Sequence, residues 1–90
     1  MAQGNVTTDH GKIRRWAEER GGIPATVKAT KAHDEPGVLR LDFEPRDKAL
    51  EPIEWDAFFE KFEKEGLAFL HQDHTQDGKV SRFHKFVERS

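Results

Sequence analysis

The chain has 90 residues and a formal net charge of −2, with 15 Lys and Arg against 17 Asp and Glu. This length fits one small domain, and the absence of cysteine excludes disulfides, thiolate catalysis and cysteine-based zinc sites. Seven Phe and two Trp can fill the core of such a domain. The chain contains neither a secretory pattern nor an apolar run of about 18 residues, so we expect a cytoplasmic protein with no membrane span.

The N-terminal end differs in composition from the rest of the chain. Residues 1–8 are mostly small and polar and show no apolar period, which predicts a flexible tail. We expect residues 9–90 to form a single α+β domain.

The first periodic segment is helical. Ile13, Trp16 and Ala17 fall at the i, i+3, i+4 spacing of one helical face. The pattern predicts a helix over residues 9–20, with Asp9 in position to cap it and a glycine pair after it to end it.

Two strands are expected next, over residues 25–30 and 38–43, joined by a turn at Pro36-Gly37. The second strand alternates apolar and polar side chains, as half-buried strands do. Its apolar side chains, which share one face, are Leu39, Leu41 and Phe43. The charged segment over residues 44–52 is expected to be a loop.

The clearest helical pattern lies in residues 53–66, which end at Gly66. Four aromatic residues at i, i+3, i+4 and i+7 form what we call the aromatic stripe: Trp55, Phe58, Phe59 and Phe62. Aromatic residues at helical spacing usually form core, but this stripe is wide for so small a domain. We therefore expect part of it to bind a partner chain.

The last third of the chain predicts a hairpin. Residues 67–73 begin apolar and end polar, as a strand leaving the core would, and Asp77-Gly78 favours a tight turn. Residues 81–88 fit two structures: a strand with Ser81 and Phe83 on one face, or a helix in which Phe83 and Phe86 cluster. The preceding turn favours the strand.

The elements follow one another in the order α-β-β-α-β-β. Two hairpins, each preceded by a helix, predict a mostly antiparallel sheet with both helices packed on one face.

The histidines offer the first candidate for chemistry, since His71, Asp73 and His74 fall within four residues. A zinc site needs three or four ligands that converge. Two histidines three apart on a strand lie on opposite faces, so exposed hairpin histidines are favoured over a metal site. We expect neither a metal nor a cofactor.

Catalytic motifs are absent from the sequence. Glu60, Glu63 and Glu65 alternate with lysines, which indicates a solvated helix face. No Ser or Thr lies in a nucleophile elbow, and no glycine-rich phosphate loop precedes a helix. The sequence therefore does not predict an enzyme.

Charge is distributed unevenly. Residues 49–80 hold three basic and eight acidic residues. Basic side chains of the first helix and the last segment would form a surface for phosphate contacts if these elements lie together. The candidate nucleic-acid-binding residues are Lys12, Arg14, Arg15, Arg82, Lys85 and Arg89.

Four segments resemble a family of short, uncharacterised bacterial proteins, some of them labelled 1,4-alpha-glucan branching enzyme. These segments are DHGKIRRWAEERGGIPATV (9–27), PGVLRLDF (36–43), WDAFFEKFEKEGLAFLHQD (55–73) and SRFHKFV (81–87). The resemblance implies no established activity. A branching enzyme works with carboxylates at the mouth of a barrel of about 250 residues, which this chain is too short to build, so we judge the label mistaken. Glu54 stands where the family pattern has a Ser or Thr cap.

These observations favour a non-enzymatic binding or regulatory module, whose partner is another protein or a second copy of the chain. The alternative is a nucleic-acid-binding accessory protein that uses the basic residues of the first helix and the C-terminal strand.

Overall fold

The computed structural model describes residues 4–30 and 37–89, which form an α+β fold in the order β-α-β-β-β-α-β-β. The helices are α1 (His10–Glu19) and α2 (Trp55–Lys64), and a 3₁₀ turn spans Lys28–Thr30. The strands are β1 (Asn5–Thr7), β2 (Ile23–Val27), β3 (Leu39–Asp42), β4 (Leu50–Pro52), β5 (Leu67–His71) and β6 (His84–Glu88). No helix of the described residues is long and apolar enough to cross a membrane.

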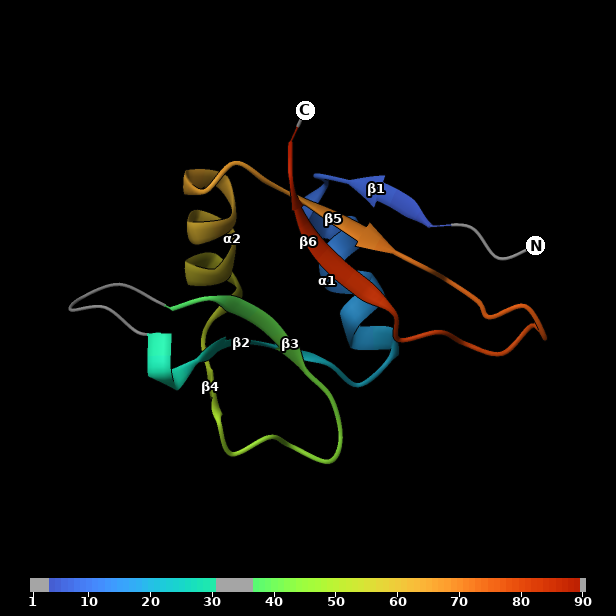
Figure 1. Cartoon of the computed structure of the whole chain (residues 1–90), viewed down its shortest axis with the longest axis horizontal. Helices are drawn as coiled ribbons and strands as arrows, with labels where there is room; N and C mark the ends of the chain where they lie inside the picture. The colour runs from blue at the N-terminus through green and yellow to red at the C-terminus, as the bar shows by residue number, and fades with distance from the viewer. Residues whose placement is uncertain (1–3, 31–36, 90) are drawn as a thin grey trace.

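The strands form two antiparallel sheets instead of the expected one. Sheet A has the order β1-β5-β6 and sheet B the order β3-β2-β4. A third strand is added to each hairpin: β1 pairs with β5, and β4 pairs with β2. Because β5 and β2 are then paired on both edges within their own sheets, they cannot join the two hairpins into one sheet. Figure 1 shows α1 behind sheet A, and α2 at the side of the molecule, in contact with both sheets.

The two extra strands correct the expected element order. Asn5–Thr7, assigned to the tail, pairs with β5, and Leu50–Pro52, assigned to a loop, pairs with β2. Each is only three residues long, too short for an alternating pattern to show in the sequence. Their backbone groups are paired by strands distant in the chain, which local sequence does not reveal.

The expected helices are confirmed, and their ends have local causes. The Asp9 side chain accepts a hydrogen bond from the Lys12 N–H at 3.1 Å and so caps α1. The Glu54 side chain makes no such bond at the start of α2. Gly21 and Gly66 follow the helices with φ of 73° and 61°, a left-handed conformation that favours glycine.

Both expected hairpins are present. The β2–β3 pair is antiparallel, although β2 begins at Ile23 instead of residue 25 and ends at Val27. Pro36 of the expected turn between these strands lies outside the described residues. The β5–β6 hairpin turns at Gly78, whose φ is 83°, and residues 84–88 form a strand, the alternative that the turn favours.

The core lies against β3 of sheet B, which contributes Leu39 and Leu41, and between the helices and the inner face of sheet A. Phe69 of β5 and Phe86 of β6 are cross-strand partners on this face. Trp16 of α1 packs against Phe69, and Phe58 and Phe62 of α2 pack against Phe86. The buried cluster consists of Ile13, Trp16, Ala17, Leu39, Leu41, Phe58, Phe62 and Phe69.

Candidate ligand-binding pocket

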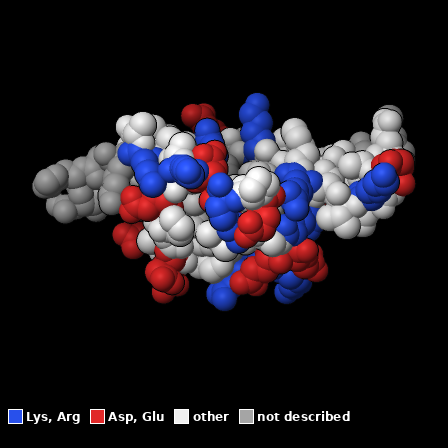
Figure 2. All heavy atoms as spheres, turned by 90° about the horizontal axis from the view of Figure 1, so that it is seen from below, with Lys and Arg blue, Asp and Glu red and all other residues white. Residues whose placement is uncertain are grey.

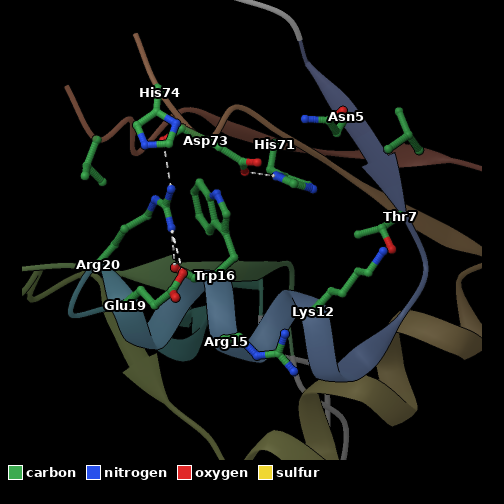
Figure 3. Close-up of a pocket in the computed structure, with 12 residues that line it drawn as sticks. Asn5, Thr7, Lys12, Arg15, Trp16, Glu19, Arg20, His71, Asp73 and His74 are labelled. Atoms are coloured by element: carbon green, nitrogen blue, oxygen red, sulfur yellow. Dashed lines mark hydrogen bonds and ion pairs between the residues drawn. The ribbon is translucent and has the colours of Figure 1, made fainter. Parts of the chain in front are cut away.

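An open pocket of about 820 Å³ lies between β1, α1 and the beginning of the β5–β6 hairpin. The pocket lies at one end of the layer between α1 and sheet A. The side chains there are mostly polar, whereas those in the rest of the layer are mostly aromatic (Figure 3). Two regions far apart in the sequence build the pocket, residues 5–20 and 71–80, so no local motif could mark it.

The sheet wall of the pocket comes from strand register. Asn5 is paired with His71, and Thr7 with Phe69, whose side chain is buried against α1. Because alternate residues of a strand share a face, Asn5, Thr7 and His71 lie on this inner face. The Thr7 hydroxyl oxygen also accepts the Asp9 N–H at 3.0 Å, which fixes β1 to the start of α1.

The helix wall consists of four side chains of α1 at i, i+3, i+4 and i+7: Lys12, Arg15, Trp16 and Glu19. Lys12 extends toward Thr7, and Arg15 lies lower, along α1 (Figure 3). Neither cationic side chain makes an ion pair or hydrogen bond with any residue that the structure describes. Both are therefore free to meet a ligand.

Arg20 supports the pocket floor and is already fully engaged. Its guanidinium donates to the carbonyl oxygens of Ser81 (2.5 Å), Asp73 (2.9 Å) and Trp16 (3.0 Å), and its side chain is only 5% exposed. It also lies 4.3 Å from the centre of the Trp16 ring. These bonds fasten both sides of the loop between β5 and β6 to the end of α1.

His71 and Asp73 form a side-chain pair on the hairpin side. His71 Nδ1 lies 2.8 Å from Asp73 Oδ1, and an ionised carboxylate can only accept, so Nδ1 donates. This leaves Nε2 of His71 available on the opposite edge of the ring. His74 also lines the pocket, so the two histidines reach one cavity; no group of three or more metal-ligating side chains occurs among the described residues.

Trp16 carries the least expected feature of the pocket. Its side chain is predicted as core, and it is only 5% exposed. Its indole Nε1–H, however, is buried without a hydrogen-bond partner among the described residues. Figure 3 shows the indole standing between Arg20 and the His71–Asp73 pair. A buried donor without an acceptor is unusual and costs stability.

The aromatic stripe lies at the other end of the core. Phe58 and Phe62 are 0% exposed, so neither offers surface to a partner in this fold. Trp55 and Phe59 are half-buried and stack with ring centroids 5.4 Å apart. The His10 ring also stacks on Phe59, with the ring centroids 4.1 Å apart.

The six candidate nucleic-acid-binding cations do not form one surface. Arg14 pairs with Glu18 at 3.1 Å, and Arg89 pairs with Glu63 at 2.6 Å. Lys85 lies opposite Leu70 on the outer face of sheet A, away from the pocket that contains Lys12 and Arg15.

Arg82 lies 5.4 Å from the ring centre of Phe43 and donates to the Glu44 carbonyl oxygen. Figure 2 shows acidic and basic side chains interspersed over the face seen there. Among the six cations, Lys12 and Arg15 are therefore brought to one cavity.

Glu63 and His84, which lie outside the pocket, have shifted pKa values. Hydrogen bonds from Arg89 and His10 lower the pKa of Glu63 to about 2. Burial lowers the pKa of His84, against the opposing effect of its hydrogen bond with the Arg82 carbonyl.

Sequence reasoning placed Lys12 and Arg15 in a basic patch and left Asn5 and Thr7 in a tail, because the signal that joins them is the β1–β5 register. No protein-family model, curated protein or solved structure matches this chain. The resemblance to short bacterial proteins therefore stays a prediction.

Proposed function

We propose that the domain is a non-enzymatic binding module that receives a segment of another protein at the pocket between β1, α1 and the β5–β6 hairpin. The observation that carries the proposal is a pair of cations on the wall of an open pocket, Lys12 and Arg15, whose side chains have no partner among the described residues. Val80, which is 62% exposed, adds apolar surface to the pocket lining. A polar pocket with adjoining apolar surface suits a protein segment with an acidic residue next to an apolar one.

Binding fits this pocket better than catalysis does. The His71–Asp73 pair has the arrangement of a base and its orienting carboxylate, but such a pair acts on a nucleophile within hydrogen-bond reach. Among the described lining residues the only hydroxyl is that of Thr7, and its oxygen is engaged with the Asp9 N–H.

In a second version of this proposal, the protein partner is another copy of the chain, which binds at the aromatic stripe. It would depend on Trp55 and Phe59, whose side chains are half-buried, while Phe58 and Phe62 would support them from the core. Sedimentation of the purified domain across a hundredfold concentration range tests it. A single monomeric species at every concentration would reject self-association through the aromatic stripe.

The alternative function is nucleic-acid binding by basic side chains of α1 and β6, in which Lys12 and Arg15 contact phosphates at the pocket and exposed Lys85 contacts phosphates separately, on the outer face of sheet A. Such binding falls steeply with salt, in proportion to the number of phosphates contacted. Retention of the domain on DNA or RNA columns at low salt, lost as salt is raised, would support it.

One capture experiment separates these functions. The tagged domain is compared with Lys12→Glu/Arg15→Glu and with a control of equal charge change outside the pocket, Arg14→Glu/Lys85→Glu. We expect the wild type and the control to retain the same proteins, which the pocket variant loses.

Nuclease treatment completes the design. Loss of all retained material on treatment, with both variants impaired, would move the function to nucleic acid. Equal retention by the wild type and the pocket variant would reject the pocket as the binding surface.

A further inference from the structure

We infer that the pocket binds a carboxylate group, supplied by an acidic side chain or the C-terminus of a protein partner. That the partner is a protein rests on the proposed function; the carboxylate chemistry rests on the pocket itself. Among the described residues, its lining supplies cations and a buried N–H donor that have no partner, and its two carboxylates are already paired.

The charges of the lining select an anion. It contains three cations, Lys12, Arg15 and Arg20, and two carboxylates, Glu19 and Asp73, so it is net positive by one with both histidines neutral. The carboxylates have partners: Glu19 lies 3.6 Å from Arg20, and Asp73 accepts from His71. The unbalanced charge therefore belongs to Lys12 and Arg15.

The hydrogen-bonding groups select an acceptor. The Trp16 Nε1–H is buried on the inner wall without an acceptor among the described residues, and the Lys12 and Arg15 side chains are donors only. An ionised carboxylate accepts through both oxygens and donates through neither, so it matches this set. An ammonium or guanidinium ligand would meet the like charge of Lys12 and Arg15.

The size of the excess charge favours a carboxylate over a phosphate group. A phosphate monoester carries about −1.5 to −2 at neutral pH, whereas a carboxylate carries a single charge, equal to the excess in the lining. The pocket, at about 820 Å³, also leaves room for the residue that bears the carboxylate, with Val80 against its apolar part.

The test uses the indole N–H signals of the full ¹⁵N-labelled chain. Trp16 and Trp55 give one signal each, and Trp55→Phe assigns them. Sodium acetate is the probe, with sodium chloride at equal ionic strength as the blank. We expect acetate to shift the Trp16 signal saturably and to leave the Trp55 signal at its chloride position.

Variants locate the binding. Lys12→Ala and Arg15→Ala are each expected to raise the acetate dissociation constant about fivefold, the effect of losing one partly exposed charge contact. Arg14→Ala, on the same helix but outside the pocket, is expected to leave it unchanged. A Trp16 shift that is the same in acetate and chloride would overturn the inference, as would equal binding by all three variants.

Further arms distinguish the ligands. Inorganic phosphate that binds more tightly than acetate would overturn the carboxylate assignment, and so would saturation of the Trp16 shift by oligonucleotide alone. Failure here is distinguishable from failure of the proposed function. Protein capture that depends on Lys12 and Arg15 without acetate binding rejects only the carboxylate, whereas acetate binding without such capture rejects only the protein partner.

Discussion

The layer between the helices and sheet A is closed at one end and open at the other. At α2, Phe58 and Phe62 pack against Phe86 and are fully buried. At α1, Trp16 is followed by the pocket, in which Lys12 and Arg15 occupy the same helical face. The contrast shows that helical spacing identifies the side of a helix that faces the protein, while the kind of residue at those positions decides between core and site.

The largest effect is expected at the closed end. Phe58→Ala removes a ring that is 0% exposed and packed among Trp55, Phe62 and Phe86, and should lower the free energy of unfolding by about 3–5 kcal/mol. Urea unfolding measures the loss. Phe83→Ala, at a ring that is 55% exposed, is the control and should change stability by less than about 0.5 kcal/mol. Similar losses in both variants would contradict the closed-end core.

A smaller loss is expected at the floor of the open end. Arg20→Met keeps the length of the side chain but leaves the carbonyl oxygens of Ser81 and Asp73 without their donor. We expect a loss of about 2–3 kcal/mol, because these are charged, part-buried hydrogen bonds. Thermal unfolding measures it, and amide shift changes should concentrate in the hairpin. A variant as stable as the wild type would show that these bonds do not hold the hairpin.

His84 makes the stability of the core pH-dependent. Its ring lies among Trp16, Phe43 and Phe69, and burial keeps its pKa in the folded protein below the ordinary value of 6.5. The unfolded chain therefore takes up a proton more readily, and stability should fall as pH drops below about 6.5.

Comparison with His84→Phe isolates this effect. Urea unfolding at pH 7.5 and pH 5.5 should show a larger loss on acidification for the wild type than for the variant. Equal losses would contradict the burial of an uncharged His84. Arg40, whose charge also lowers the His84 pKa, is retained in both proteins.

The smallest effect is expected at Glu63, which joins α1 to the C-terminal end through His10 and Arg89 (2.8 and 2.6 Å). Its pKa is about 2 in the folded protein against 4.5 ordinarily, so its contribution is present above pH 4.5 and is lost as pH falls toward 2. Glu63→Gln should therefore be slightly less stable than the wild type at neutral pH and should approach it in acid. Added salt should reduce the difference, since the group is exposed. A difference independent of pH would contradict the charge pairing.

Local patterns were enough to predict both helices, both hairpins and the strand at residues 84–88. Ile13 and Trp16, like Phe58 and Phe62, are buried at helical spacing, and Gly21 and Gly66 end their helices in the expected conformation. These features depend on neighbours in the sequence, which is why periodicity and turn chemistry reveal them.

The division into two sheets and the pocket depend instead on pairings across the chain. Asn5 meets His71, and Ala25 meets Pro52, without any alternating pattern in β1 or β4. The sequence identified Lys12 and Arg15 as cations. Arg14 pairs locally with Glu18 of the same helix, whereas the ion pair of Arg89 with Glu63 joins residues 26 apart and exists only in the fold.

The short strand β1 has a consequence for the order of events in folding. The pairing of Asn5 with His71 closes a loop over most of the chain, which is entropically slow to form, and it is secured by only three residues. We therefore expect β1 to dock after the β5–β6 hairpin and to detach before it, so its amides should exchange with solvent faster than those of β5. The pocket would then be the last part of the molecule to assemble, and an occupant that touches both β1 and α1 would slow amide exchange in β1.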